Sequence, residues 1–201
     1  MQHQSHRLAA ILFTDIVGYT AMMQKNEQSA VLVNNRYVTV LKETVLSQGG
    51  KILNDYGDGS LCTFHSATQA MACAIEMQQK FQLEPIVPLR IGLHVGEIFF
   101  DGGKVFGDGV NIASRVQSLG VANSILFSNV IKNEIKNKQE FKYVFLGEFN
   151  FKNVDGPMEV FALSNPGLSV PKKQELTGKL KQIEKKYSDI KFITAAAILL
   201  L

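Results

Sequence analysis

The sequence predicts an α+β fold, a sandwich in which helices cover one mainly antiparallel sheet. Three observations lead to this prediction. Segments with apolar residues at helical spacing alternate with short strand-like runs. Several of those runs come in pairs around turn residues, as the strands of hairpins do. The composition, with 46% hydrophobic and 19% charged residues, is typical of a globular domain with a packed core.

Three segments have the helical pattern. The first follows the loop at 15–20 and ends before the glycine pair at 49–50. Ser66 is a candidate cap for the second, because Gln69 follows three residues later and an apolar stripe runs on to position 81. The third is a short helix over 110–119 that a glycine ends.

The strand-like segments are apolar runs bounded by glycine, proline or polar turn residues. The first two after the opening strand flank a Gly-Asp-Gly turn, which predicts a β-hairpin. In chain order the predicted strands cover residues 8–14, 51–56, 60–64, 89–95, 97–100, 125–127, 143–146, 149–151 and 159–163.

The chain divides into three predicted regions. A globular domain covers 1–166, a lysine-rich helical linker covers 167–191, and an uncharged apolar segment covers 192–201. The apolar segment is about half the roughly 20 residues that span a bilayer. We interpret it as the truncated start of a transmembrane helix that anchors the protein, and the alternative is a terminal helix packed on the domain.

Charge and cysteine usage exclude some classes of function. Residues 1–166 hold 14 Lys and Arg against 15 Asp and Glu, so the domain is nearly neutral and a broad nucleic-acid surface is not expected. Cys62 and Cys73 lie in apolar stretches, which predicts buried, reduced thiols. A reducing, cytoplasmic environment fits these features, and no secretion signal is visible at the N-terminus.

Two aspartates are candidate metal ligands. Asp15 follows a buried strand and precedes a loop of small residues that opens a helix, and Asp58 lies between two glycines in the hairpin turn. If the hairpin pairs with the first strand, the two carboxylates meet at one sheet edge and suit Mg²⁺. Separately, each residue also has an ordinary interpretation, as a helix cap and a turn residue.

Asn111 and Arg115 are candidate phosphoryl-binding residues. They are four positions apart, so on a helix they share one face and present an amide and a permanent guanidinium together. The alternative is an exposed polar pair without a function.

Four segments together resemble the class III adenylyl/guanylyl cyclase catalytic domain of the bacterial type, over residues 8–163. They are 13–20 (FTDIVGYT), 57–59 (GDG), 89–97 (LRIGLHVGE) and 105–115 (VFGDGVNIASR). The resemblance implies a ferredoxin-like βαββαβ sandwich core that functions as a head-to-tail homodimer, with active sites in the cleft between subunits. It makes the domain at 1–166 the catalytic domain.

The resemblance also implies roles for single residues. Asp15, Asp58 and the Ile16 carbonyl would hold two Mg²⁺ or Mn²⁺ ions. On the partner subunit, Asn111 would orient the ribose and Arg115 would stabilise the transferring phosphorus. Lys152 is the nearest match to the phosphate-binding lysine of the family.

The positions that contact the base depart from the usual pattern of adenylyl cyclases. Asn54 stands where a lysine is usual, and Lys104 stands where an aspartate is usual. We therefore predict a nucleotidyl cyclase that converts a nucleoside triphosphate, ATP first, into the 3′,5′-cyclic nucleotide and pyrophosphate. The alternatives are a guanylate cyclase and a silent cyclase-like module that binds nucleotide or only dimerises. A palm-type cyclic-dinucleotide synthase would show an acidic turn that this sequence lacks.

Overall fold

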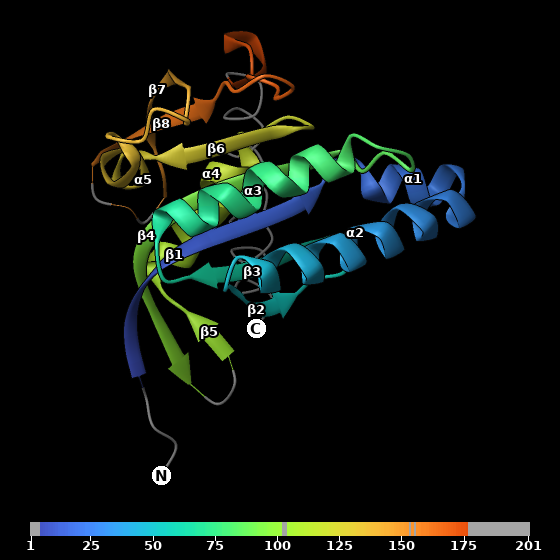
Figure 1. The fold of residues 1–201 in the computed structure, drawn as a ribbon, viewed down its shortest axis with the longest axis horizontal. Helices are drawn as coiled ribbons and strands as arrows, with labels where there is room; N and C mark the ends of the chain where they lie inside the picture. Colours follow the sequence, from blue (N-terminus) through green and yellow to red (C-terminus); the bar gives the residue numbers. More distant parts are fainter. Residues whose placement is uncertain (1–4, 102–103, 153, 155, 177–201) are drawn as a thin grey trace, which may run out of the picture.

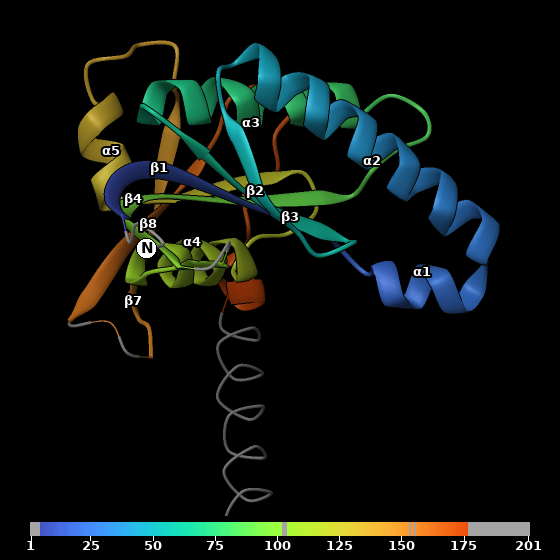
Figure 2. The ribbon, with the colours of Figure 1, turned by 90° about the horizontal axis from the view of Figure 1, so that it is seen from below.

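A computed structural model describes residues 5–101, 104–152, 154 and 156–176, and it shows one mixed sheet with helices on both faces (Figures 1 and 2). The strand order is β2-β3-β1-β4-β6-β8-β7, with β5 paired to β4. The β4–β6 pair is parallel and the other pairs are antiparallel. The strands are β1 (Ser5–Ile16), β2 (Lys51–Asp55), β3 (Gly59–Phe64), β4 (Leu89–Asp101), β5 (Lys104–Phe106), β6 (Ser124–Ser128), β7 (Tyr143–Asn150) and β8 (Pro157–Leu163). The helices are α1 (Tyr19–Lys25), α2 (Glu27–Ser47), α3 (Ala67–Phe81), α4 (Asp108–Ser118) and α5 (Asn129–Ile135).

The predicted α+β sandwich is confirmed, and its core follows the ferredoxin-like order. The elements β1, α2, β2, β3, α3 and β4 succeed one another along the chain, and β1 lies between β3 and β4 in the sheet. The central strand, β1, has consecutive apolar residues, so the side chains on both of its faces can be buried. Ala10 and Leu12 pack with α2 and α3, whereas Ala9 and Ile11 pack against the face that α4 covers (Figure 2).

The structure differs from the predicted elements at several boundaries. The first helical segment is two helices, because Asn26 ends α1 and caps α2 by accepting a hydrogen bond from the Ser29 N–H at 3.0 Å. The predicted strands 89–95 and 97–100 form one strand, β4, since the whole of β1 pairs along it. Segments 143–146 and 149–151 likewise merge, except that the last residue lies beyond β7. The short elements β5 and α5 were not predicted.

The described residues after position 166, namely 167–176, pack on the domain. Leu168 contacts the core beside α2 and α3, and Leu176 is buried in the cluster under α4. Asn123 anchors this segment through two hydrogen bonds. Its side-chain amide donates to the Gly167 carbonyl at 2.6 Å, and its backbone carbonyl accepts from the Ser169 N–H at 3.0 Å. None of the helices in the described ranges is long and apolar enough to cross a membrane. The rest of the predicted linker and the apolar segment 192–201 lie outside those ranges.

Candidate active site

The pairing of β1 with β3 brings Asp15 and Asp58 to the same edge of the sheet. Asp15 lies opposite Gly59, and the Ile16 N–H donates to the Asp58 carbonyl at 2.7 Å. A Cβ atom on Gly59 would lie 2.3 Å from the Thr14 carbonyl oxygen, so this close approach requires glycine. The turn that contains Asp58 is therefore held against the end of the strand that contains Asp15.

Buried hydroxyls beneath the two aspartates fix the same strands. The hydroxyl of Tyr37, on α2, lies 2.6 Å from the Thr14 hydroxyl and donates to the Ser60 hydroxyl at 2.8 Å. The Thr14 hydroxyl oxygen also accepts a hydrogen bond from the Ser60 N–H at 2.9 Å. Burial raises the pKa of Tyr37, so its hydroxyl keeps its proton and remains a donor. Sequence analysis missed this cluster, because Tyr37 had only the appearance of a core residue on a helix.

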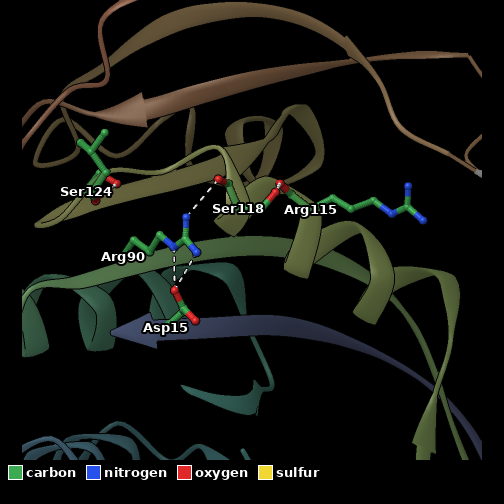
Figure 3. A network of polar contacts seen from close by, with 6 residues as sticks. Asp15, Arg90, Arg115, Ser118 and Ser124 are labelled. Atoms are coloured by element: carbon green, nitrogen blue, oxygen red, sulfur yellow. Dashed lines mark hydrogen bonds and ion pairs between the residues drawn. The ribbon is translucent and has the colours of Figure 1, made fainter. Parts of the chain in front are cut away.

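Arg90 holds Asp15 directly (Figure 3). The two residues face each other across the β1–β4 pair, and the Nε and Nη2 atoms of Arg90 lie 2.8 and 2.7 Å from Asp15 Oδ2. The third nitrogen, Nη1, donates to the Ser118 carbonyl at the end of α4, at 3.2 Å. Sequence analysis did not assign Arg90 a role, because the strand register that sets it opposite Asp15 is a tertiary feature.

The charges around Asp15 fit a divalent cation. Burial is the largest effect and raises the Asp15 pKa above 3.8, the Arg90 guanidinium lowers that pKa, and the nearby Asp58 charge raises it again. Two carboxylates that repel each other are stabilised by a cation bound between them. Both Arg90 bonds go to Oδ2, which leaves Oδ1 outside the ion pair. Within the described ranges no group of three or more His, Cys, Asp or Glu side chains is placed to hold a metal ion. Two carboxylates suit Mg²⁺, which takes its other oxygens from water and phosphate.

Asn111 and Arg115 are not among the residues of α4 that are buried against the sheet. The inner side of the helix packs on the sheet through Ile112, Ala113 and Val116. Asn111 is exposed and Arg115 is half-buried. Figure 3 shows the Arg115 side chain extending away from the Asp15–Arg90 pair. A single chain therefore does not bring all four predicted residues together.

The remaining predicted site residues are spread over other elements. Asn54 lies in β2 opposite Leu61, and its buried Oδ1 atom has no hydrogen-bond partner within the described ranges. Lys104 begins β5, opposite Asp101, but its side chain lies outside the described part of the chain. Lys152 is exposed, two residues after β7 ends.

Comparison with known proteins decides the family. Residues 1–165 match the family model described as the adenylate and guanylate cyclase catalytic domain. The chain belongs to this cyclase family. The fold agrees, because a crystal structure of an adenylate/guanylate cyclase/hydrolase from Silicibacter pomeroyi has a TM-score of 0.72 and 29% identity, covering 85% of this chain and 100% of that one.

Curated relatives of this cyclase domain include adenylate cyclases and a guanylate cyclase subunit. A putative adenylate cyclase from Rhizobium meliloti is 32% identical over 166 residues, which are 79% of this chain and 28% of that protein. The human guanylate cyclase soluble subunit beta-2 is 37% identical over 89 residues, which are 41% of this chain and 14% of that protein. The chain thus spans less than a third of either relative.

Proposed function

We propose that this chain is a nucleotidyl cyclase that converts a nucleoside triphosphate, ATP first, into the 3′,5′-cyclic nucleotide and pyrophosphate. The active form is a head-to-tail homodimer with two active sites. Anchoring through 192–201 remains a prediction, because that segment lies outside the described residues.

One observation supports the proposal above all. Asp15 and Asp58 meet at one sheet edge, whereas Arg115 extends from α4 away from them. A site that needs both sets of residues is therefore assembled from two chains. Two-fold symmetry then makes two such sites per dimer, since each chain contributes its aspartates to one and its α4 to the other.

The reaction is an in-line attack of the ribose 3′-oxygen on the α-phosphorus, with pyrophosphate as the leaving group. Two Mg²⁺ or Mn²⁺ ions, held by Asp15, Asp58 and the Ile16 carbonyl, would lower the pKa of the attacking hydroxyl and neutralise the triphosphate. Asn111 of the partner subunit orients the ribose. Arg115 of the partner subunit stabilises negative charge that develops at phosphorus. Lys152 is the candidate for binding the terminal phosphates, and no protein nucleophile takes part.

Product analysis tests the activity. Purified protein is incubated with each of the four common nucleoside triphosphates and Mg²⁺ or Mn²⁺, and cyclic nucleotide is identified by mass spectrometry. We expect Asp15→Asn and Asp58→Asn to abolish turnover, because one carboxylate does not hold two cations against a triphosphate. Asp55→Asn is the matched control, since Asp55 is exposed in the same hairpin and its Oδ1 accepts a hydrogen bond from Gly57 that an amide oxygen can also accept. Full activity in either metal-site variant would contradict the proposal.

Mixing two inactive variants tests the shared site. Arg115→Ala should lower the rate by roughly 10²–10³, as loss of a preorganised charge-stabilising donor does. A dimer of one Asp58→Asn subunit and one Arg115→Ala subunit contains one complete site, so it should recover about half of the parental rate per dimer. If purified mixed dimers stay inactive, the site lies within one chain.

A further inference from the structure

We propose that Arg90 is a positioning residue that connects the two active sites of the dimer, by joining Asp15 to the end of α4. The inference rests on the proposed function, because it needs Asp15 to serve one site and α4 of the same chain to serve the other. It concerns contacts within one chain.

The connection is made by the planar fork of a single guanidinium. Two of its nitrogens bind Asp15 Oδ2, at 2.8 and 2.7 Å, and the third donates to the Ser118 carbonyl at 3.2 Å (Figure 3). Because the guanidinium is rigid, its nitrogens move together, and a displacement of Asp15 is passed to the end of α4. A lysine ammonium is a point charge and lacks this fixed fork.

From Ser118 the contacts lead on to Arg115. The Ser118 hydroxyl donates to the Arg115 carbonyl at 2.7 Å. This bond connects the last turn of α4 to the residue proposed to stabilise charge at the transferring phosphorus. Gln117, the neighbour of Ser118, is buried in the same turn.

The end of α4 is packed closely enough to respond to these contacts. A Cβ atom on Gly92, two residues along β4 from Arg90, would lie 2.3 Å from the Gln117 backbone nitrogen. Close-packed elements shift together rather than deform smoothly. A cation held through Asp15 Oδ1 would share the carboxylate with Arg90 on Oδ2, so occupancy at one site would change how strongly Arg90 holds the helix that serves the other.

A dimer with one working site separates this role from any role of Arg90 within its own site. In the mixed dimer of an Asp58→Asn subunit and an Arg115→Ala subunit, the working site takes its aspartates from the second subunit and its α4 from the first. Arg90→Lys is then introduced only into the Asp58→Asn subunit. There Arg90 contacts the Asp15 of the inactive site, and it reaches the working site only through α4.

We expect this Arg90→Lys change to lower the kcat of the working site by roughly 2- to 30-fold, the usual range for coupling between sites. The KM should change less, because the contacts from Arg90 lead to Arg115, which acts on the transition state, and not to Asn111, which orients the ribose. Arg36→Lys in the same subunit is the matched control, since Arg36 also donates to the carbonyl of a helix end, Lys80 at 2.8 Å, and this bond joins α2 to α3 without involving Asp15 or α4.

Amide hydrogen exchange gives a readout that does not depend on activity. In homodimers without ligand, both Arg90→Lys and Asp15→Asn should speed the exchange of residues 116–120, because each loosens the hold on the end of α4. Arg36→Lys should leave this segment unchanged. A faster exchange in Asp15→Asn is the decisive result, because within the described ranges the hydrogen bonds that lead from the Asp15 side chain to this segment pass through Arg90.

The outcomes distinguish the two proposals. If the mixed dimer without the Arg90 change is inactive, the shared site itself fails. If it is active, and Arg90→Lys leaves both its kcat and the exchange of 116–120 at parental values, the connection between sites is wrong. An equal loss of kcat in Arg36→Lys would also overturn it, because the effect would then be general destabilisation.

Discussion

At the residue scale, the Asn54 side chain has a hydrogen-bonding atom available to bind a base. Its Oδ1 atom is buried without a partner in the described part of the chain, and an amide both donates and accepts. Adenine offers a donor at N6 and an acceptor at N1, whereas guanine offers the reverse pair. One adaptable amide therefore suits either base.

This predicts weak base selectivity. The kcat/KM values for ATP and GTP should lie within about two orders of magnitude, and ATP should be the better substrate. Asn54→Ala should lower both values by roughly 2- to 13-fold, the equivalent of one hydrogen bond, with little change in their ratio. Steady-state kinetics with both nucleotides measures this, and Lys51→Ala, exposed on the same strand, is the control. A preference for ATP above about 10⁴ would mean that other residues bind the base.

Single residues also show which parts of the site the sequence can predict. Asp15 and Asp58 were predicted to share a sheet edge, because Asp15 follows one strand pattern and Asp58 lies in the turn between two others. The structure places them there. Arg90 and Tyr37 were not predicted as site residues. Their importance comes from partners 75 and 23 positions away, which no local pattern reveals.

At the element scale, the packing of α4 on β4 determines where Asn111 and Arg115 are presented. The helix lies directly over Gly92, where a Cβ atom would meet the Gln117 nitrogen at 2.3 Å and the Ala113 carbonyl oxygen at 2.5 Å. Backbone atoms cannot rotate away as side chains do. The glycine in this strand is therefore a requirement of helix packing.

Gly92→Ala should displace α4 and destabilise the fold. We expect a loss of about 1–3 kcal/mol in the free energy of unfolding, the usual cost of overpacking a core. Activity should fall by more than stability alone explains at temperatures where the variant is folded, because small displacements of catalytic groups are costly. Denaturant unfolding and kinetics at low temperature measure the two effects. Parental values in both would show that α4 tolerates the shift.

Elements also show where local patterns mislead. Two separate strands were predicted, over 89–95 and 97–100, yet β4 is continuous. Its conformation is maintained by β1, which pairs along it from Ser5 to Ile16. Pairing with a long neighbour outweighs the weak strand propensity of glycine.

At the scale of the whole molecule, the catalytic domain uses residues beyond 166. Leu168 and Leu176 pack against separate parts of the core, and Leu176 is only 5% exposed. Removing residues 167–176 would uncover the cluster under α4. That cluster supports the helix on which the second half of the site depends.

Two shortened chains test this. A chain that ends at 166 should be less stable than one that ends at 176 by about 2 kcal/mol or more of unfolding free energy, the contribution of one buried leucine. Thermal and denaturant unfolding measure both chains. Equal stability of the two would mean that the segment 167–176 contributes nothing to the domain.

The sequence by itself determined the fold class, the family and the two sets of candidate site residues. The fold class and the candidate site residues depend on local patterns, namely alternating strands and helices, a Gly-Asp-Gly turn and two polar residues four apart on a helix. The family depends on the resemblance of four segments to the cyclase catalytic domain. Only the tertiary structure decided that Arg90 faces Asp15, that three buried hydroxyls support the aspartates and that Arg115 extends away from them. The physical reason is that strand register and helix packing arise from contacts between residues far apart in the chain, where burial and close packing outweigh local preference.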